Sequence, residues 1–294
     1  MKTLNVAPPY CLVQARRGWM LANLNDFYMG AAIATYGECN EAELAVLLAL
    51  AQIPGLVVEV GANMGIHTVP LGLELQKQGR QIVAFEPQPV IFQQLCANLA
   101  LNGLMNVTTW PFACGEAQGV VNFPRQDYQN TGNFGGVAMT SSTAVANEAC
   151  VQVPCIRLDD MLQFERVGLL KIDVEGFELR VLKGGSALLQ RSRPLLYLEN
   201  DRVDNSQELI EWIWGMGYNL WWHTPQVFNP QNFFGVEKNL YGRVASFNML
   251  GVPREVNLGV PPQLIKIEDS SYHPLRPMAP VAGAAGAQTV DRAT

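Results

Sequence analysis

Histidine and charged residues are scarce in this sequence. Only 3 of the 294 residues are histidine, 16% are Asp, Glu, Lys or Arg, and the net charge is −6. Because a nucleic-acid-binding protein usually presents a basic face, this balance argues against nucleic acid as a partner. The six cysteines form no CxxC pair, and no histidines lie at zinc-finger spacing, so a structural zinc site is not expected.

Long apolar runs are also missing. No stretch reaches the roughly 18 apolar residues of a membrane span. The opening MKTLNVAPPYCLV lacks the apolar core and cleavage site of a signal peptide. The cysteines are scattered through apolar segments, as buried thiols in a reducing compartment are. We therefore expect a soluble, cytoplasmic protein that binds no membrane.

Strand-like and helix-like segments alternate along most of the chain. Hydrophobic residues make up 49%, which is enough for a sizeable α/β core. Apolar and β-branched runs predict strands at 56–61, 81–86, 106–115, 169–173, 194–200, 218–223 and 244–252. Helical spacing predicts helices at 41–52, 65–78, 89–103, 177–190 and about 205–215. This alternation indicates a mostly parallel sheet with helices on both faces, where ligands bind at the carboxyl ends of the strands.

The first two of these strands end in a glycine turn and in an acid. The turn runs from Gly61 to Gly65 with GxxxG spacing, which disfavours NAD, and it has no lysine for a phosphate. The second strand ends in Glu86, where a carboxylate can accept both hydroxyls of a ribose. A nucleoside without phosphates that is bound by acids indicates S-adenosylmethionine, whose sulfonium and ammonium groups are positive.

Glu59 lies inside the first strand, which otherwise has the composition of a core strand. A buried carboxylate is costly unless it has a partner. A cationic cofactor beside the glycine turn is one possible partner, and neighbouring backbone N–H groups are another.

Acids also follow two later strands. Asp173 and Glu175 lie in KIDVEG, and the next strand ends in Glu199-Asn200-Asp201. A carboxylate at this place could take the proton of an attacking hydroxyl, although Asp173 could equally cap the following helix. His223 is an alternative base. Oxygen ligands of this kind also suit magnesium, but our prediction is that the site holds no metal.

Four segments together resemble the FkbM family of S-adenosylmethionine-dependent methyltransferases. They are VVEVGANMGIHTV, AFEPQPVIFQQLCANLALNG, LLKIDVEGFELRVLKGG and the strand ending in LEN. The resemblance covers about residues 36–252. It implies the class I methyltransferase fold, a Rossmann-like, seven-stranded, mostly parallel sheet with helices on both faces and its last strand antiparallel.

With this resemblance we divide the chain into three parts. We expect an N-terminal helical cap at 1–52, a methyltransferase domain at 53–252 and a flexible C-terminal tail at 253–294. A flap insertion around 118–157 interrupts the domain, because its many Gly, Asn, Ser and Thr residues break the strand–helix rhythm.

The resemblance also implies which residues contact S-adenosylmethionine. The methionine half would be held by Glu59, Gly61, Ala62, Asn63, Gly65 and Thr68. Glu86, followed by Pro87, would hold the ribose, and Ala113 and Cys114 would lie near the adenine. Asp173 would face the methyl or amino group, and Tyr36 and Glu38 belong to a segment that packs over the cofactor.

The resemblance leaves the methyl acceptor open. We expect O-methylation of a hydroxyl on a sugar or secondary metabolite, so the partner would be a small molecule, a glycan or a peptide. Methylation of a peptide or protein side-chain amide is the alternative, and a non-catalytic cofactor-binding protein is another. Segments 132–136, 221–234 and 246–249 are rich in Asn and aromatic residues, which suit a polar, ring-shaped substrate. Within them we expect Trp221 and Trp222 in the core, and His223, Asn229 and Asn232 in the site.

Overall fold

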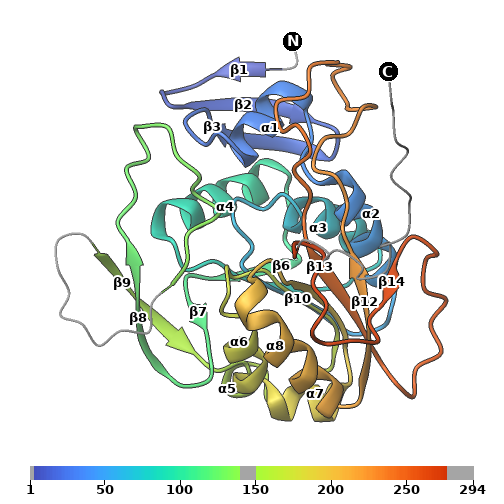
Figure 1. The fold of residues 1–294 in the computed structure, drawn as a ribbon. Helices are drawn as coiled ribbons and strands as arrows, with labels where there is room; N and C mark the ends of the chain where they lie inside the picture. The colour runs from blue at the N-terminus through green and yellow to red at the C-terminus, as the bar shows by residue number, and fades with distance from the viewer. Residues whose placement is uncertain (1–2, 140–149, 277–294) are drawn as a thin grey trace, which may run out of the picture.

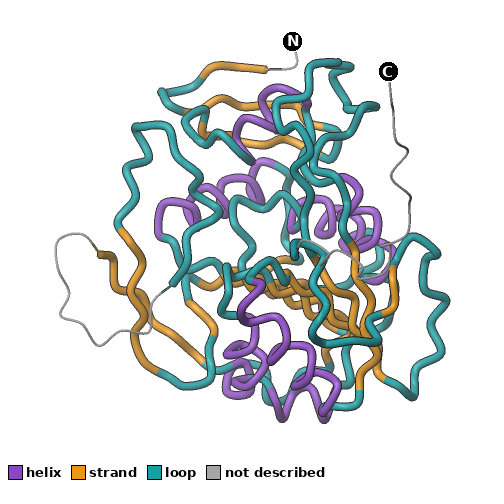
Figure 2. Tube along the Cα trace, viewed as in Figure 1, coloured by secondary structure: helices purple, strands orange, loops and turns teal. Residues whose placement is uncertain are grey.

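The computed structural model describes residues 3–139 and 150–276, and its centre is an eight-stranded sheet (Figures 1 and 2). The order across the sheet is β14-β12-β13-β11-β10-β4-β5-β6. The strands are β4 (Leu56–Val60), β5 (Ile82–Phe85), β6 (Val107–Trp110), β10 (Val167–Ile172), β11 (Leu195–Glu199), β12 (Tyr218–His223), β13 (Asn248–Pro253) and β14 (Ile265–Lys266).

The strand directions confirm the class I methyltransferase fold. Strands β6, β5, β4, β10 and β11 pair in parallel, whereas β13 runs antiparallel to both β11 and β12. The described part of the sheet has eight strands instead of the expected seven, because the short β14 adds to the free edge of β12.

Helices cover both faces of the sheet (Figure 1). One layer consists of α2 (Glu41–Leu50), α3 (Thr68–Gln76) and α4 (Pro89–Leu101), and the other of α5 (Leu158–Met161), α6 (Glu178–Gly184), α7 (Ser186–Ser192) and α8 (Val203–Gly215). Side chains alternate between the faces: Val57 packs in the core with α2 and α3, whereas Val58 and Val60 pack with α6 to α8. None of the helices within 3–139 and 150–276 combines the length and apolarity that crossing a bilayer needs.

The N-terminal region differs from the predicted helical cap. Its first part is an antiparallel sheet of β1 (Thr3–Asn5), β2 (Tyr10–Ala15) and β3 (Gly18–Asn23), and α1 (Met29–Tyr36) and α2 follow. Cys11, Val13 and Ala15 are buried at every second position, which is strand periodicity. The expectation of an all-helical cap at 1–52 is therefore wrong for the first part of that range.

The region of the expected flap contains a separate small sheet. Strands β7 (Ala113–Cys114), β8 (Gly119–Pro124) and β9 (Cys150–Ile156) form it in the order β7-β9-β8, and residues 140–149 lie outside the described part of the chain. Ala113 and Cys114 pair with β9, so they do not form the end of the third strand of the main sheet, which is β6.

The predicted flexible tail is ordered through residue 276. β14 pairs with β12, and His273 is 1% exposed, with its Nε2 atom 2.9 Å from the carbonyl oxygen of Asn200. The His273 ring also packs edge-on against Trp222 at 5.0 Å between centroids. The boundary at 253 is therefore wrong, and the remainder of the expected tail, 277–294, lies outside the described residues.

Candidate functional site

The turn after β4 brings the chain against the end of β10. Gly61 has a φ of 84°, and a Cβ atom at this position would collide with the carbonyl oxygen of Asp173. Only glycine combines this conformation with such a close approach. The glycine turn and Asp173 are therefore held together at the carboxyl edge of the sheet.

Glu86 fixes the same turn from the side of β5. One carboxylate oxygen accepts the N–H of Asn63 and the other accepts the N–H of Gln88, both at 2.9 Å. Burial raises the pKa of Glu86 to about 7, and the residue is 4% exposed. The Gln88 side chain donates to the carbonyl oxygen of Phe134 at 2.9 Å, so segment 132–136 closes over this end of the turn.

Glu59 has a partner within the chain itself. Its carboxylate lies 3.2 Å from the Lys171 ammonium and accepts a hydrogen bond of 2.6 Å from the Thr68 hydroxyl. Lys171 is the residue next to Glu59 in the register of β10 and β4. Within the chain, the partners of Glu59 are thus two side chains and not the expected backbone N–H groups. Glu59 and Thr68 are buried beneath the turn and support it from below.

Lys171 links this buried pair to the site. Its ammonium also lies 3.3 Å from the Asp173 carboxylate. Burial alone would lower the pKa of Lys171, but the charges of Asp173, Glu59 and Glu43 outweigh that effect and raise it. The lysine therefore remains charged and ties Asp173 to the strand layer.

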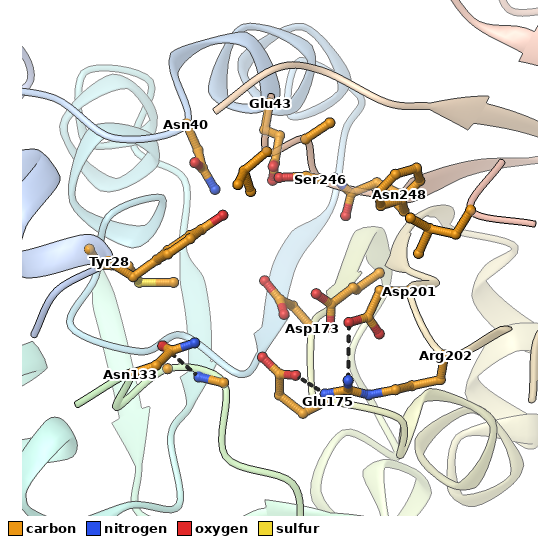
Figure 3. Close-up of a pocket in the computed structure, with 18 residues that line it drawn as sticks. Tyr28, Asn40, Glu43, Asn133, Asp173, Glu175, Asp201, Arg202, Ser246 and Asn248 are labelled. Atoms are coloured by element: carbon orange, nitrogen blue, oxygen red, sulfur yellow. Dashed lines mark hydrogen bonds and ion pairs between the residues drawn. The ribbon is translucent and has the colours of Figure 1, made fainter. Parts of the chain in front are cut away.

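A cavity of about 380 Å³ opens at the carboxyl ends of β10 and β11 (Figure 3). Acids and amides predominate among its polar side chains, which come from several separate parts of the chain. The lining comprises Tyr28, Met29, Asn40, Glu43, Asn133, Gly135, Gly136, Asp173, Glu175, Glu199, Asp201, Arg202, Val244, Ala245, Ser246, Phe247, Asn248 and Leu275.

Three of the acids form a cluster on one side of this cavity. Oxygen atoms of Asp173, Glu175 and Glu199 lie within 4.8 Å of one another. Burial, followed by the charge of Asp173 and its neighbours, raises the pKa of Glu199 well above its ordinary value. Arg202 balances part of the remaining charge by pairing with Glu175 and, at 3.4 Å, with Asp201. One oxygen of the buried Glu199 carboxyl group also has no hydrogen-bond partner within the described residues.

The magnesium hypothesis fits this arrangement only in part. Asp173 and Glu199 do lie together, but the Asn200 amide donates to the Ser206 hydroxyl at 2.9 Å and is buried away from the cluster. Activity measured after chelation, with and without added magnesium, distinguishes a metal site from an acid cluster balanced by Arg202.

His223 is not brought together with Asp173. Its Nδ1 atom lies 2.7 Å from the Tyr197 hydroxyl. The residue faces a second cavity of about 700 Å³, between α2 and residues 223–230. Trp222 is 2% exposed, which confirms its core position, and Trp221 is half-buried.

Tyr36 and Glu38 do not line the first cavity either. Glu38 pairs with Arg16 at 2.6 Å and accepts hydrogen bonds from the Asn229 amide and the Phe233 N–H. The Tyr36 hydroxyl donates to the carbonyl oxygen of Lys238. Tyr36 and Glu38 therefore join the N-terminal region to the loop after β12. The Asn232 side chain forms hydrogen bonds within that loop, to the backbone of Asn229 and Val236.

The sequence analysis missed Glu43, Tyr28 and Lys171. Glu43 lies on the buried face of α2 with Leu44 and Leu47, and Lys171 lies inside an otherwise apolar strand. Each of these two is an ionisable residue among apolar residues that are typical of a core. The same observation drew attention to Glu59 and could have drawn attention to Glu43 and Lys171.

Known methyltransferases match part of this chain. The chain is 29% identical over 165 residues to Methyltransferase sdnD of Sordaria araneosa. This alignment covers 46% of this chain and 62% of sdnD. The chain is also 25% identical over 150 residues to Hexuronic acid methyltransferase AglP of Haloferax volcanii. That alignment covers 50% of this chain and 56% of AglP. The matched part is thus less than two thirds of either relative's length. The solved Methyltransferase FkbM of Methylobacillus flagellatus aligns with a TM-score of 0.44 and 15% identity, over 67% of this chain and 43% of that one.

A family profile covers the part of the chain that builds the site. The Methyltransferase FkbM domain matches residues 59–220, more than half of the chain, from Glu59 in β4 to Leu220 in β12. The match includes the glycine turn, Glu86 and the acids that follow β10 and β11. It confirms the family expected from the sequence. The chain belongs to the FkbM family of S-adenosylmethionine-dependent methyltransferases.

Proposed function

We propose that this chain transfers a methyl group to a hydroxyl of a sugar or secondary metabolite bound in the 380 Å³ cavity. One observation carries the proposal: the cavity adjoins the glycine turn, and its walls combine carboxylates with amide and hydroxyl groups. Amides and hydroxyls can donate to and accept from the several hydroxyls of a sugar. The name of AglP, a hexuronic acid methyltransferase, supports a sugar acceptor.

The chemistry of the donor set fits S-adenosylmethionine. Glu86 would hold the ribose, residues 61–65 would hold the methionine half, and Asp173 would face the positive groups. The turn leaves no room for a side chain at Gly61, and the nearby carboxylates complement a cation. When bound, the cofactor supplies an electrophilic methyl group.

The remaining contributions come from the cavity walls. Asp173 pairs with the Lys171 ammonium at 3.3 Å, which fixes its side chain in place, so it would serve orientation. Glu199, whose burial favours the protonated form, would donate a hydrogen bond to an oxygen of the acceptor. His223 would act only if the acceptor reached across to the second cavity.

Cofactor binding is tested first. Glu86→Ala is expected to weaken the affinity for S-adenosylhomocysteine about 10- to 100-fold in titration calorimetry, because it removes the carboxyl group that would accept both ribose hydroxyls. Glu74→Ala, on the exposed side of α3, is the matched control and should leave the affinity unchanged. Thermal melting confirms that both variants are folded. An unchanged affinity in Glu86→Ala would contradict the assignment.

Turnover is tested with methyl-labelled cofactor and two acceptor pools, a glycan pool that also contains hydroxylated secondary metabolites and a pool of peptides. Label in the glycan pool, with the mass gain of one methyl group per product, is the expected result. Label in the peptide pool alone would favour amide methylation. Binding of S-adenosylhomocysteine without any transfer would favour a non-catalytic protein.

A further inference from the structure

Glu43 is a buried acid that reaches the cavity from the side opposite the acid cluster. It lies on α2, before the matched family domain begins, and is 3% exposed. Figure 3 shows its side chain beside Ser246, facing Asp173 across the cavity. A carboxylate that is buried among core residues and still lines a cavity is well placed to meet a bound molecule.

The side-chain amide of Asn248 lies in the same wall of the cavity as Glu43. The residue is 4% exposed and lines the cavity, and its Nδ2 group makes no well-formed hydrogen bond within the described part of the chain, although it lies near enough to Glu43 to favour the charged form of that carboxyl group. A buried amide N–H₂ without an acceptor is costly in a folded protein. A ligand oxygen beside Glu43 and Ser246 would satisfy it.

We propose that Glu43 and Asn248 together bind the acceptor hydroxyl, with Asn248 donating to its oxygen and Glu43 accepting its proton during methyl transfer. This inference rests on the proposed function and names the group that removes the proton. A hydroxyl is both donor and acceptor, so one oxygen can serve the two side chains at once.

The neighbouring acids are less suited to this task. Asp173 is committed to the Lys171 ammonium, and burial, with the charge of Asp173, raises the pKa of Glu199 well above its ordinary value and so disfavours its charged form. Burial raises the pKa of Glu43 to about 7, which is the range of an effective general base. His67, whose Nε2 atom lies 3.9 Å from Glu43, is kept neutral because burial lowers its pKa well below the ordinary value.

Several titratable groups surround Glu43. The ones that interact with it electrostatically come from its own N-terminal region, the β4–α3 loop and the strands β10 and β11: Tyr28, Cys39, His67, Lys171, Asp173 and Tyr197. Of these, Lys171 favours the charged form of Glu43, and Asp173 favours the neutral form.

The transfer balances as follows. The O–H bond of the acceptor breaks, its proton goes to the Glu43 carboxylate, and an electron pair on the oxygen forms the new O–CH₃ bond. The S–CH₃ bond of the methyl donor breaks at the same time, and its electron pair stays on sulfur. Glu43 then loses the proton to solvent.

The test uses Glu43→Gln in the full-length chain, with Glu41→Gln as the matched control. Glu41 lies on the same helix but pairs with Arg17 and lines the second cavity. Methylation of the glycan pool is followed from pH 6 to 9, and S-adenosylhomocysteine affinity is measured in parallel. Glu43→Gln should lower kcat/KM by about 10²- to 10⁴-fold, remove the rise of kcat/KM near neutral pH and leave cofactor affinity unchanged. Asn248→Ala should mainly raise KM.

The outcomes separate the two proposals. Transfer by Glu43→Gln within about tenfold of the wild-type protein, with the same pH profile, overturns the role of Glu43 alone. Loss of cofactor affinity in Glu43→Gln also overturns it, because the residue would then serve the cofactor or the fold. If the wild-type protein methylates neither pool, the proposed function fails and this inference fails with it.

Discussion

Lys171 is the residue on which the buried charges of this protein depend. It pairs with Glu59 at 3.2 Å and with Asp173 at 3.3 Å, and its side chain is 4% exposed. Lys171→Met leaves the Glu59 carboxylate unpaired in the core, and we expect it to lower the free energy of unfolding by about 3–5 kcal/mol in urea titration. Lys77→Met removes an exposed pair with Glu74 and should cost less than about 1 kcal/mol. Equal effects of the two changes would contradict the buried-pair assignment.

The carboxyl group of Glu43 also makes stability depend on pH. Its pKa is raised by burial to about 7 in the folded chain, from 4.5 for an exposed glutamate. A raised pKa means that the folded state holds the proton more tightly than the unfolded state. The stabilisation is complete below pH 4.5, the pKa of this carboxyl group in the unfolded chain, and is lost as the pH rises through about 7, its pKa in the folded chain. Glu43→Gln should therefore gain stability relative to the wild-type protein, on the order of 2 kcal/mol, between pH 5 and 8.

Thermal melting of the two proteins at pH 5 and pH 8 provides this measurement. Glu41→Gln, which changes a carboxylate near the surface of the same helix, should show no such pH-dependent gain. A difference between Glu43→Gln and the wild-type protein that stays constant with pH would contradict a Glu43 carboxyl group whose pKa is raised by burial.

At the scale of an element, the turn after β4 is defined by close packing. Gly61→Ala places a methyl group against the carbonyl oxygen of Asp173 at a φ of 84°, whereas Gly79→Ala has a φ of 67° and nothing within 4 Å. Both changes strain the backbone, by about 1–3 kcal/mol, but only Gly61→Ala must also separate β4 from the end of β10. We expect it to cost several kcal/mol more and to weaken cofactor binding. Similar melting temperatures for the two variants would contradict this packing.

At the scale of the whole molecule, Glu38 connects the N-terminal region to the loop after β12. It binds Arg16, the Asn229 amide and the Phe233 N–H at 2.6, 2.7 and 2.8 Å. Glu38→Ala removes this shared acceptor, and we expect amide hydrogen exchange to accelerate in residues 228–241 and in β2 together. Glu41→Ala, which breaks the neighbouring pair with Arg17, should leave that exchange unchanged. Acceleration confined to one of the two regions would show that Glu38 does not couple them.

Local pattern predicted much of the fold and part of the site. The parallel strands, the glycine turn and the acids at 173 and 199 follow from runs of residues that are close in sequence, and the structure places these acids in one cavity. The N-terminal strands and the order of residues 253–276 were missed. Their stability comes from packing on α4 and β12, which no local pattern reports.

The sequence by itself determined the family, the strand–helix alternation and the edge of the sheet where polar residues gather, because periodicity and turn residues act over a few positions. Only the tertiary structure decided that Lys171 neutralises Glu59, that Glu43 reaches the cavity and that His223 faces elsewhere. These outcomes depend on strand register and on helix placement, which bring together residues far apart in the chain. The energy of a buried charge is set by such distant neighbours, so the chemistry of the site belongs to the fold as a whole.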